Sequence, residues 1–256
     1  MAHHPLIGGT SYKITKGRTL IGGTGYDVTK GKTLVGGTAY DIPLTSGAMQ
    51  AFCDLMATAT PNISLSAGRN NSSTGYVSFS SYSITFPIWV LSIFNGEFSW
   101  TKFTDFNTKT VIYQSSASYG NCYNNGGTFY YSHTGSSQTS VYGACIFGFS
   151  FSGYTEQEVD AILAGVKKKT GAGRNASSTS TVSLSVAAGD TVLASIYNLN
   201  NPYYALSSPV GTVISGGTHP NNPSLLYVSG TTASLSTNGI SAASVYGGSV
   251  ISLQEA

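Results

Sequence analysis

The side chains whose types and spacing come closest to a hydrolytic site are two carboxylates, Glu97 and Asp105. A glycosidase needs two carboxyl groups that face each other across a cleft, one acting as acid and the other as base or nucleophile. This pair lies in a region of expected loops, and most other acidic residues fall in expected turns or at helix ends. We therefore interpret Glu97 and Asp105 as unrelated loop carboxylates. A hydrolase of cell-surface polymers is the weakest of the three functions considered.

Histidine, cysteine and serine do not form a recognisable catalytic or metal-binding pattern either. His133 and His219 fall in polar loops, and no HxH or HExxH spacing is present. No GxSxG motif marks a nucleophilic serine. The cysteines are odd in number and lack CxxC spacing, so we expect neither a disulfide framework nor a zinc site from Cys53, Cys122 and Cys145. The expected protein is non-enzymatic, with no catalytic residues, no metal and no cofactor.

Residues 119–142 have the composition of a recognition surface. They combine tyrosines and a phenylalanine with Asn, Ser and Gly, a mixture found in binding loops that join rigid aromatic area to adaptable hydrogen bonding. Such rings stack on sugar faces when exposed. The alternative is that they pack inside a sandwich or at a subunit interface. The candidate ligand or interface residues are Tyr119, Tyr123, Tyr130, Tyr131 and Tyr142.

The overall composition favours an all-β protein. Charged residues make up only 9% of the 256 residues, while the apolar fraction is 41% and hydroxyl-bearing residues are abundant. Strands with one packed face and one hydroxyl-bearing face have this composition. The net charge of +2 is small, so nucleic acid is not an expected partner, although five of the twelve basic residues lie in the first 32 positions. No apolar run approaches the roughly 20 residues of a membrane span, and no secretory signal pattern opens the chain.

A 14-residue repeat occupies the start of the sequence. Residues 6–19 are LIGGTSYKITKGRT, residues 20–33 are LIGGTGYDVTKGKT, and residues 34–42 begin a third copy, LVGGTAYDI. Each copy predicts short strands separated by glycine-bearing turns. Because strand pairs this short do not fold alone, the repeats must stack on one another or on a neighbour. We expect an assembly arm over residues 1–44, with contacts through Tyr12, Tyr26, Tyr40, Lys16 and Lys30.

A second, longer duplication covers the rest of the chain. The segment GRN-NSSTGYVSFS from Gly68 returns as GRN-ASSTSTVSLS from Gly173, and VLSIFN from Val90 returns as VLASIYN from Val192. The offset stays between 102 and 105 residues for these segments and for the repeated SVYG at residues 140–143 and 244–247. Two copies of one small domain follow from this pattern.

A helix is expected before each copy. Thr155 and Glu158 have capping-box spacing, and apolar residues then recur at helical intervals from Val159 to Val166. We expect Lys167, Lys168 and Lys169 to close this helix, since cations favour a helix carboxyl end, with Gly171 or Gly173 stopping it. The matching face before the first copy consists of Met49, Phe52, Cys53 and Met56, which makes Cys53 a core residue.

The predicted fold is therefore all-β. The arm (residues 1–44) is followed by two duplicated small β-sandwich, jelly-roll-like domains, each preceded by a short helix. They span residues 45–153 and 154–256. The apolar run FPIWVLSIF at residues 86–94 is expected to be a buried strand, with Trp89 in the core.

The repeat pattern LIGGTxYxIxKGKTLIGGTxYxI over residues 6–42 resembles repeats in virion structural proteins of tailed bacteriophages, of the tail, baseplate or head-decoration type. GDTVLASIY at residues 189–197 also resembles the small β-sandwich modules of such proteins. The resemblance implies a non-enzymatic, tail- or baseplate-associated component of the virion, assembled in the host cytoplasm.

The partners implied by this resemblance are other virion structural proteins and further copies of the chain, as a trimer or hexamer. No membrane partner is expected. The alternative function is a head fibre, a capsid decoration or a receptor-binding appendage, whose ligand would be a host-surface glycan.

Overall fold

The computed structural model describes most of the two domains and isolated strands of the arm. The described residues are 6–7, 10–11, 18–21, 24–27, 31–35, 38–42, 47–69, 76–80, 84–94, 96–105, 109–114, 121–125, 128–132, 144–174, 181–197, 202–209, 211–217, 226–236 and 247–256. Strands account for most of them, and the predicted all-β fold class is confirmed.

The described strands of the arm pair as hairpins. Each hairpin is a two-stranded antiparallel sheet whose strands flank a Gly-Gly pair. The pairing register recurs with the sequence period: Leu6 faces Ser11, Leu20 faces Gly25 and Leu34 faces Ala39. The strands are β1 (Leu6–Ile7), β2 (Thr10–Ser11), β3 (Arg18–Ile21), β4 (Thr24–Asp27), β5 (Gly31–Val35) and β6 (Thr38–Ile42).

The first domain begins with helix α1 (Gly47–Ala57) and continues as two antiparallel sheets. The larger sheet has the order β11-β10-β9-β14-β7, and the smaller has the order β12-β13-β8. The strands are β7 (Ala59–Arg69), β8 (Tyr76–Ser80), β9 (Ile88–Phe94), β10 (Glu97–Phe103), β11 (Lys109–Gln114), β12 (Asn121–Asn125), β13 (Thr128–Ser132) and β14 (Ala144–Phe151).

The second domain repeats this plan strand for strand. Helix α2 (Glu156–Ala164) precedes a larger sheet of order β15-β22-β17-β18-β19 and a smaller sheet of order β16-β21-β20. Replacing each strand of the first domain by the one eight places later reproduces both sheet orders. The strands are β15 (Val166–Arg174), β16 (Thr181–Ser185), β17 (Thr191–Tyr197), β18 (Tyr203–Ser207), β19 (Val213–Gly217), β20 (Leu226–Ser229), β21 (Thr232–Ser236) and β22 (Gly247–Glu255).

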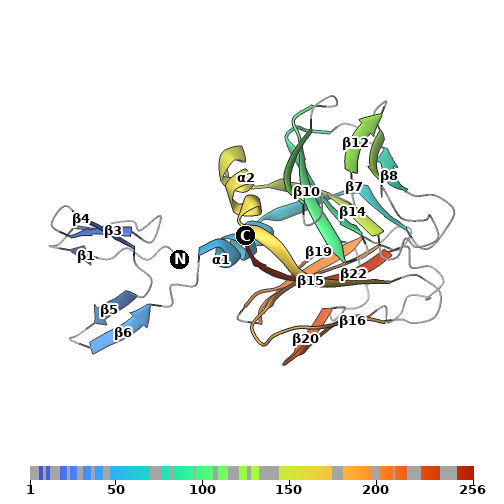
Figure 1. Cartoon of the computed structure of the whole chain (residues 1–256). Helices are drawn as coiled ribbons and strands as arrows, with labels where there is room; N and C mark the ends of the chain where they lie inside the picture. The colour runs from blue at the N-terminus through green and yellow to red at the C-terminus, as the bar shows by residue number, and fades with distance from the viewer. Residues whose placement is uncertain are drawn as a thin grey trace.

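The sheets stack in four layers, with the two larger sheets in the middle (Figure 1). Each larger sheet is thus covered on both faces, by its own smaller sheet and by the other domain. An alternating pattern is expected only where one face of a sheet meets water. Because β9 is covered on both faces, its sequence is a nearly continuous apolar run. Along β9, Val90 points to the first domain's own core, while Trp89 and Leu91 point to the core between the domains.

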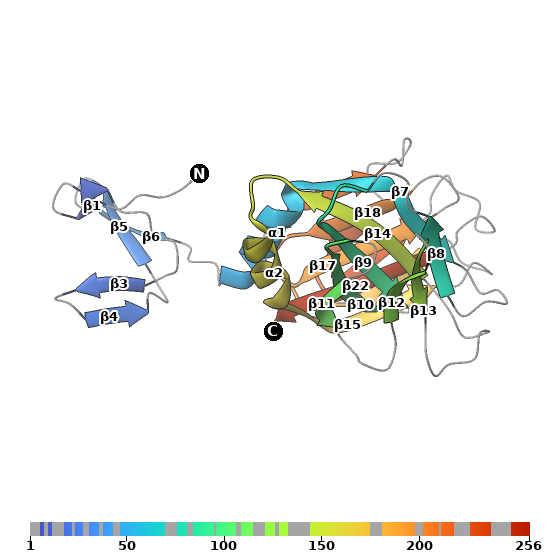
Figure 2. The same cartoon turned by 90° about the horizontal axis from the view of Figure 1, so that it is seen from above.

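Both helices cover the same end of the central layer (Figures 1 and 2). The predicted apolar face of α1 is confirmed, since Met49, Phe52, Cys53 and Met56 are all buried in the central core. The capping box at Thr155 is confirmed as well: its hydroxyl accepts from the Glu158 N–H, and the Glu158 carboxylate accepts from the Thr155 N–H.

The predicted end of α2 is wrong. The helix stops at Ala164 with Gly165 as its cap, and the Gly165 N–H donates to the Ile162 carbonyl. Glycine favours a helix end, and the β-branched Val166 that follows is buried at the start of β15. Lys167, Lys168 and Lys169 therefore lie in an edge strand, where lysines discourage pairing with another sheet.

Candidate functional site

The two carboxylates considered for a hydrolytic site, Glu97 and Asp105, are not brought together, and Glu97 lies in a strand and not in the expected loop. Glu97 is the first residue of β10 and Asp105 lies two residues beyond its last, so the strand separates them by about 20 Å at its rise of roughly 3.3 Å per residue. The Glu97 carboxylate instead accepts a hydrogen bond from the Nζ of Lys168 in the second domain. These positions therefore do not form the opposed pair that a glycosidase requires.

The two cysteines whose side chains are described, Cys53 and Cys145, are structural. Cys53 and Cys145 are free and buried in the central core. Burial, with a contribution from the nearby charge of Asp54, raises the pKa of the Cys53 thiol to about 11. The thiol is therefore protonated at neutral pH and a poor nucleophile, which confirms its prediction as a core residue.

Two further findings concern the described residues as a whole. No cluster of three or more His, Cys, Asp or Glu side chains is placed to hold a metal ion among them. Among the described residues, no helix has both the length and the apolar character needed to cross a membrane. His3, His4, His133 and His219 lie outside the described residues.

The structure describes the predicted tyrosine surface only in part. Tyr123 pairs with Tyr130, and Cys122 with Tyr131, across the β12–β13 hairpin of the first domain's outer sheet. The side chains of these residues are not described. Tyr119 and Tyr142 lie outside the described residues altogether.

The predicted contacts of the arm are likewise described only as backbone or not at all. Tyr26 and Tyr40 belong to β4 and β6, without described side chains. Tyr12, Lys16 and Lys30 lie outside the described residues.

The best-defined site in the molecule is the contact between the two domains, which we call the interdomain core. It is formed by inward residues of both larger sheets together with both helices. At its centre, Tyr204 of β18 meets Phe149 of β14 edge to face, with ring centroids 5.0 Å apart. Phe149 also packs against Trp100, which is fully buried. Aromatic contacts of this kind add to the hydrophobic stabilisation from burial.

The two sides of the interdomain core are unequal in size. In β14, Phe147 pairs with Leu91, whereas in β22 the residue that pairs with the corresponding Leu193 is Ile251. At the next position on the same face, two residues along, β14 carries Phe149 and β22 carries Leu253. The first domain therefore contributes bulky aromatic rings where the second contributes smaller aliphatic side chains, and together they fill the layer.

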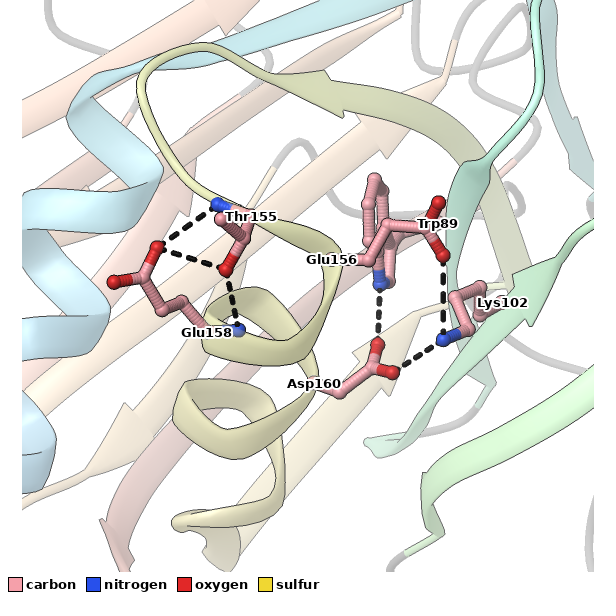
Figure 3. Close-up of polar contacts among 6 residues, drawn as sticks. All are labelled: Trp89, Lys102, Thr155, Glu156, Glu158 and Asp160. Carbon is pink, nitrogen blue, oxygen red and sulfur yellow. Dashed lines mark hydrogen bonds and ion pairs between the residues drawn. The ribbon is translucent and has the colours of Figure 1, made fainter.

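A polar cluster closes one side of the interdomain core (Figure 3). Asp160 of α2 accepts a hydrogen bond of 3.0 Å from the indole Nε1 of Trp89 and one from the Nζ of Lys102. Glu156 lies one helical turn away, 3.8 Å from the same Nζ. Lys102 is largely buried, so Asp160 both neutralises its charge and fixes α2 against the first domain's sheet.

A second contact joins the domains through backbone alone. A Cβ atom placed on Gly171 of β15 would lie 2.2 Å from the carbonyl oxygen of Gly96, in the turn between β9 and β10. The two backbone segments can approach this closely only because both residues are glycines. The ion pair between Lys168 and Glu97 lies beside them, and burial lowers the pKa of Lys168.

A third polar site lies within the second domain. The Asp190 carboxylate accepts from Lys169 Nζ at 2.9 Å, from Ser252 Oγ at 2.7 Å and from the Ala187 N–H at 3.0 Å. Partial burial opposes ionisation, but these hydrogen bonds, together with the Lys169 charge, outweigh it and hold the pKa of Asp190 below its ordinary value.

Sequence reasoning did not find the interdomain core. The signal that could have found it is the run from Ile88 to Ile93, whose residues are buried on both faces of β9. A small sandwich supplies a cover for only one face of its sheet, so a second cover was needed.

Comparison with known proteins places the chain in no family. No family model matches it, and no curated protein matches it either. Among solved structures, the flagellar hook junction protein FlgK from Burkholderia pseudomallei aligns with 82% of this chain and 46% of its own, at 12% identity and a TM-score of 0.11. The chain thus spans less than half the length of that protein.

Proposed function

We propose that this protein is a non-enzymatic structural component of a bacteriophage virion, associated with the tail or baseplate and anchored by residues 1–44. The observation that carries the proposal is the interdomain core, which joins two duplicated β-domains into one block. A block of this kind suits a structural role, because a close-packed core transmits position with little deformation.

The placement of the chain ends supports an anchoring role for the arm. The arm leads into α1, and the carboxyl terminus returns to the same end, where the Ala256 N–H donates to the Gly165 carbonyl at the end of α2. Figures 1 and 2 show both helices there. A particle that held the arm would therefore hold the block by its helical end and leave the opposite end facing outward.

The phage assignment rests on the resemblance of the 14-residue repeats to those of tailed-phage structural proteins. Partners are accordingly other virion proteins and further copies of this chain, as a trimer or hexamer. The short hairpins of the repeats suit this role, since two-stranded sheets gain stability by adding to a neighbouring sheet edge.

Deletion of residues 1–44 tests the anchor. Buried residues of the three hydrophobic cores begin at Met49, so we expect the truncated protein to fold, with circular dichroism and a urea midpoint close to those of the full chain. We also expect it to be missing from purified particles, as measured by mass spectrometry of the virion proteins. Normal incorporation of the folded truncated protein would refute the anchor.

A receptor- or glycan-binding appendage, including a head fibre or capsid decoration, is the second candidate. It is favoured by the cross-strand pairing of Tyr123 with Tyr130 in the outer sheet of the first domain. A glycan array on the full chain should then show binding that is lost in a Tyr123→Ser, Tyr130→Ser double variant. Tyr227→Ser is the matched control, because Tyr227 is 63% exposed on the outer sheet of the second domain. Equal binding by both variants would remove this candidate.

A further inference from the structure

Several of the contacts between the two domains are reciprocal. Strand β7 of the first domain contacts β19 of the second, and β15, the counterpart of β7, contacts β11, the counterpart of β19. Strands β14 and β22, which correspond to each other, are in mutual contact. Contacts that recur when the halves are interchanged are those of an isologous dimer; the twofold relation is approximate here, because the contacts of β7 with β17 and of β10 with β15 are more extensive than their counterparts.

The helices follow the same rule and are exchanged between the halves. Helix α1, which leads the first domain, contacts β15, β19 and β22 of the second domain. Helix α2, which leads the second, contacts β15, the strand that follows it, and also β11 of the first domain. Through Asp160 it is bonded to Trp89 and Lys102 of the first domain. The helices also contact each other, with the Ala48 Cβ beside Gly165. Each half therefore supplies a helix that completes the other.

We infer that the chain is a covalent pseudo-dimer of two helix-plus-eight-strand modules, in which each module is the binding partner of the other. The pairing surface is the interdomain face of each larger sheet together with the exchanged helix. The peptide link between the halves, at residues 152–153, contributes proximity and is not required to keep the folded halves together.

The pairing is specific for a first half with a second half. Phe147 and Phe149 occupy the places that Ile251 and Leu253 occupy in the other half. Two first halves would bring large rings to both sides of a layer that is already filled, and overpacking of this kind is destabilising. The partner that fits the first half is therefore the second-half module and not another copy of itself.

Cleavage of the folded full chain tests the inference. Ser152 and Gly153 are exposed, and Gly153 has open space around it, so a site-specific protease sequence inserted between them is accessible. After complete cleavage in native buffer, we expect both fragments to elute together at the volume of the uncut protein and to appear as one complex by native mass spectrometry. Separate elution of the two fragments, or homodimers of either one, would overturn it.

A matched pair of variants shows which surface holds the cut halves. Leu206 and Leu235 are both fully buried leucines of the second domain, but Leu206 lies in the interdomain core and Leu235 in the domain's own core. Leu206→Ala should raise the dissociation constant of the cleaved complex about 100-fold, the ratio that corresponds to about 2.8 kcal/mol. Leu235→Ala should change it less than about tenfold. Equal effects would contradict the assigned surface.

Hydrogen exchange on the uncut, unaltered chain gives a second test that does not depend on whether the chain with the inserted protease sequence folds. Hydrogen exchange in rising urea should show β9 of the first domain and β17 of the second losing protection at the same concentration, because each completes the other. Loss of protection in one half while the other remains folded would refute the pairing of the two modules.

Discussion

Gly171→Ala is the sharpest test of the interdomain contact. The added Cβ would lie 2.2 Å from the Gly96 carbonyl oxygen and 2.9 Å from its Cα, and both are backbone atoms. Since no side chain can rotate away, β15 and the β9–β10 turn must separate by about 1.2 Å or more to reach the 3.4 Å of an ordinary contact, and this is a form of overpacking. Such strain costs about 1–3 kcal/mol, and the separation also disturbs the neighbouring Lys168–Glu97 pair.

Urea and thermal unfolding give the readout for this variant. We expect a single transition, because the two domains share one core, with a destabilisation of about 2 kcal/mol and a melting temperature lower by about 4–8 °C. Gly248→Ala is the matched control: it is also a strand glycine, but its added Cβ would find its nearest neighbour at 3.5 Å. That change should be neutral or stabilise by about 0.5 kcal/mol. If Gly171→Ala proved as stable as Gly248→Ala, the close backbone contact would be refuted.

Three further predictions concern polar groups. Asp160→Asn should destabilise the fold by about 1–2 kcal/mol, because it leaves the largely buried Lys102 without its anion. Glu156 is half exposed, so Glu156→Gln should cost under about 0.5 kcal/mol. Equal urea midpoints for the two variants would contradict this. Ser195→Ala should stabilise the fold by about 1 kcal/mol, since the buried Ser195 Oγ has no hydrogen-bond partner among the described residues. Ser252→Ala should destabilise it, because the Ser252 hydroxyl donates to the Asp190 carboxylate. If both variants changed the free energy of unfolding in the same direction, these hydrogen-bonding roles would be refuted. Asp190 has a lowered pKa in the folded state, so its stabilisation is present above its unfolded pKa and is lost as pH falls through the folded value. The urea midpoint of Asp190→Asn should therefore approach that of the unaltered protein as the pH falls below the ordinary pKa of an aspartate. A difference that stays constant with pH would count against this.

The sequence predicted the individual strands and helices better than the way in which the sheets stack. Hydroxyl-rich alternating segments predicted strands, and Thr155 with Glu158 predicted the start of α2, because these signals act between residues close in the chain. The end of α2 was mispredicted because three lysines were read as a helix terminus, when Gly165 and the buried Val166 had already changed the local preference to strand.

The pairing of the two domains depends on information that no local pattern carries. Trp89 was predicted to be a core residue, but its sequence neighbourhood does not say that its partner Asp160 lies 71 residues away on the helix of the other domain. The sequence does not predict the Gly96–Gly171 contact either, since a glycine in a turn and a glycine in a strand each have ordinary local explanations.

Joining two mutually paired units in one chain changes how their surfaces can evolve. In a homodimer, one codon change alters both copies of a residue, so an enlarged side chain near the twofold axis meets its own image. In a tandem gene each half is encoded separately, and a gain of volume at Phe149 can be balanced by a loss at Leu253. The same independence applies to the two outer sheets, so one half can acquire a surface for a new neighbour while the other keeps its own.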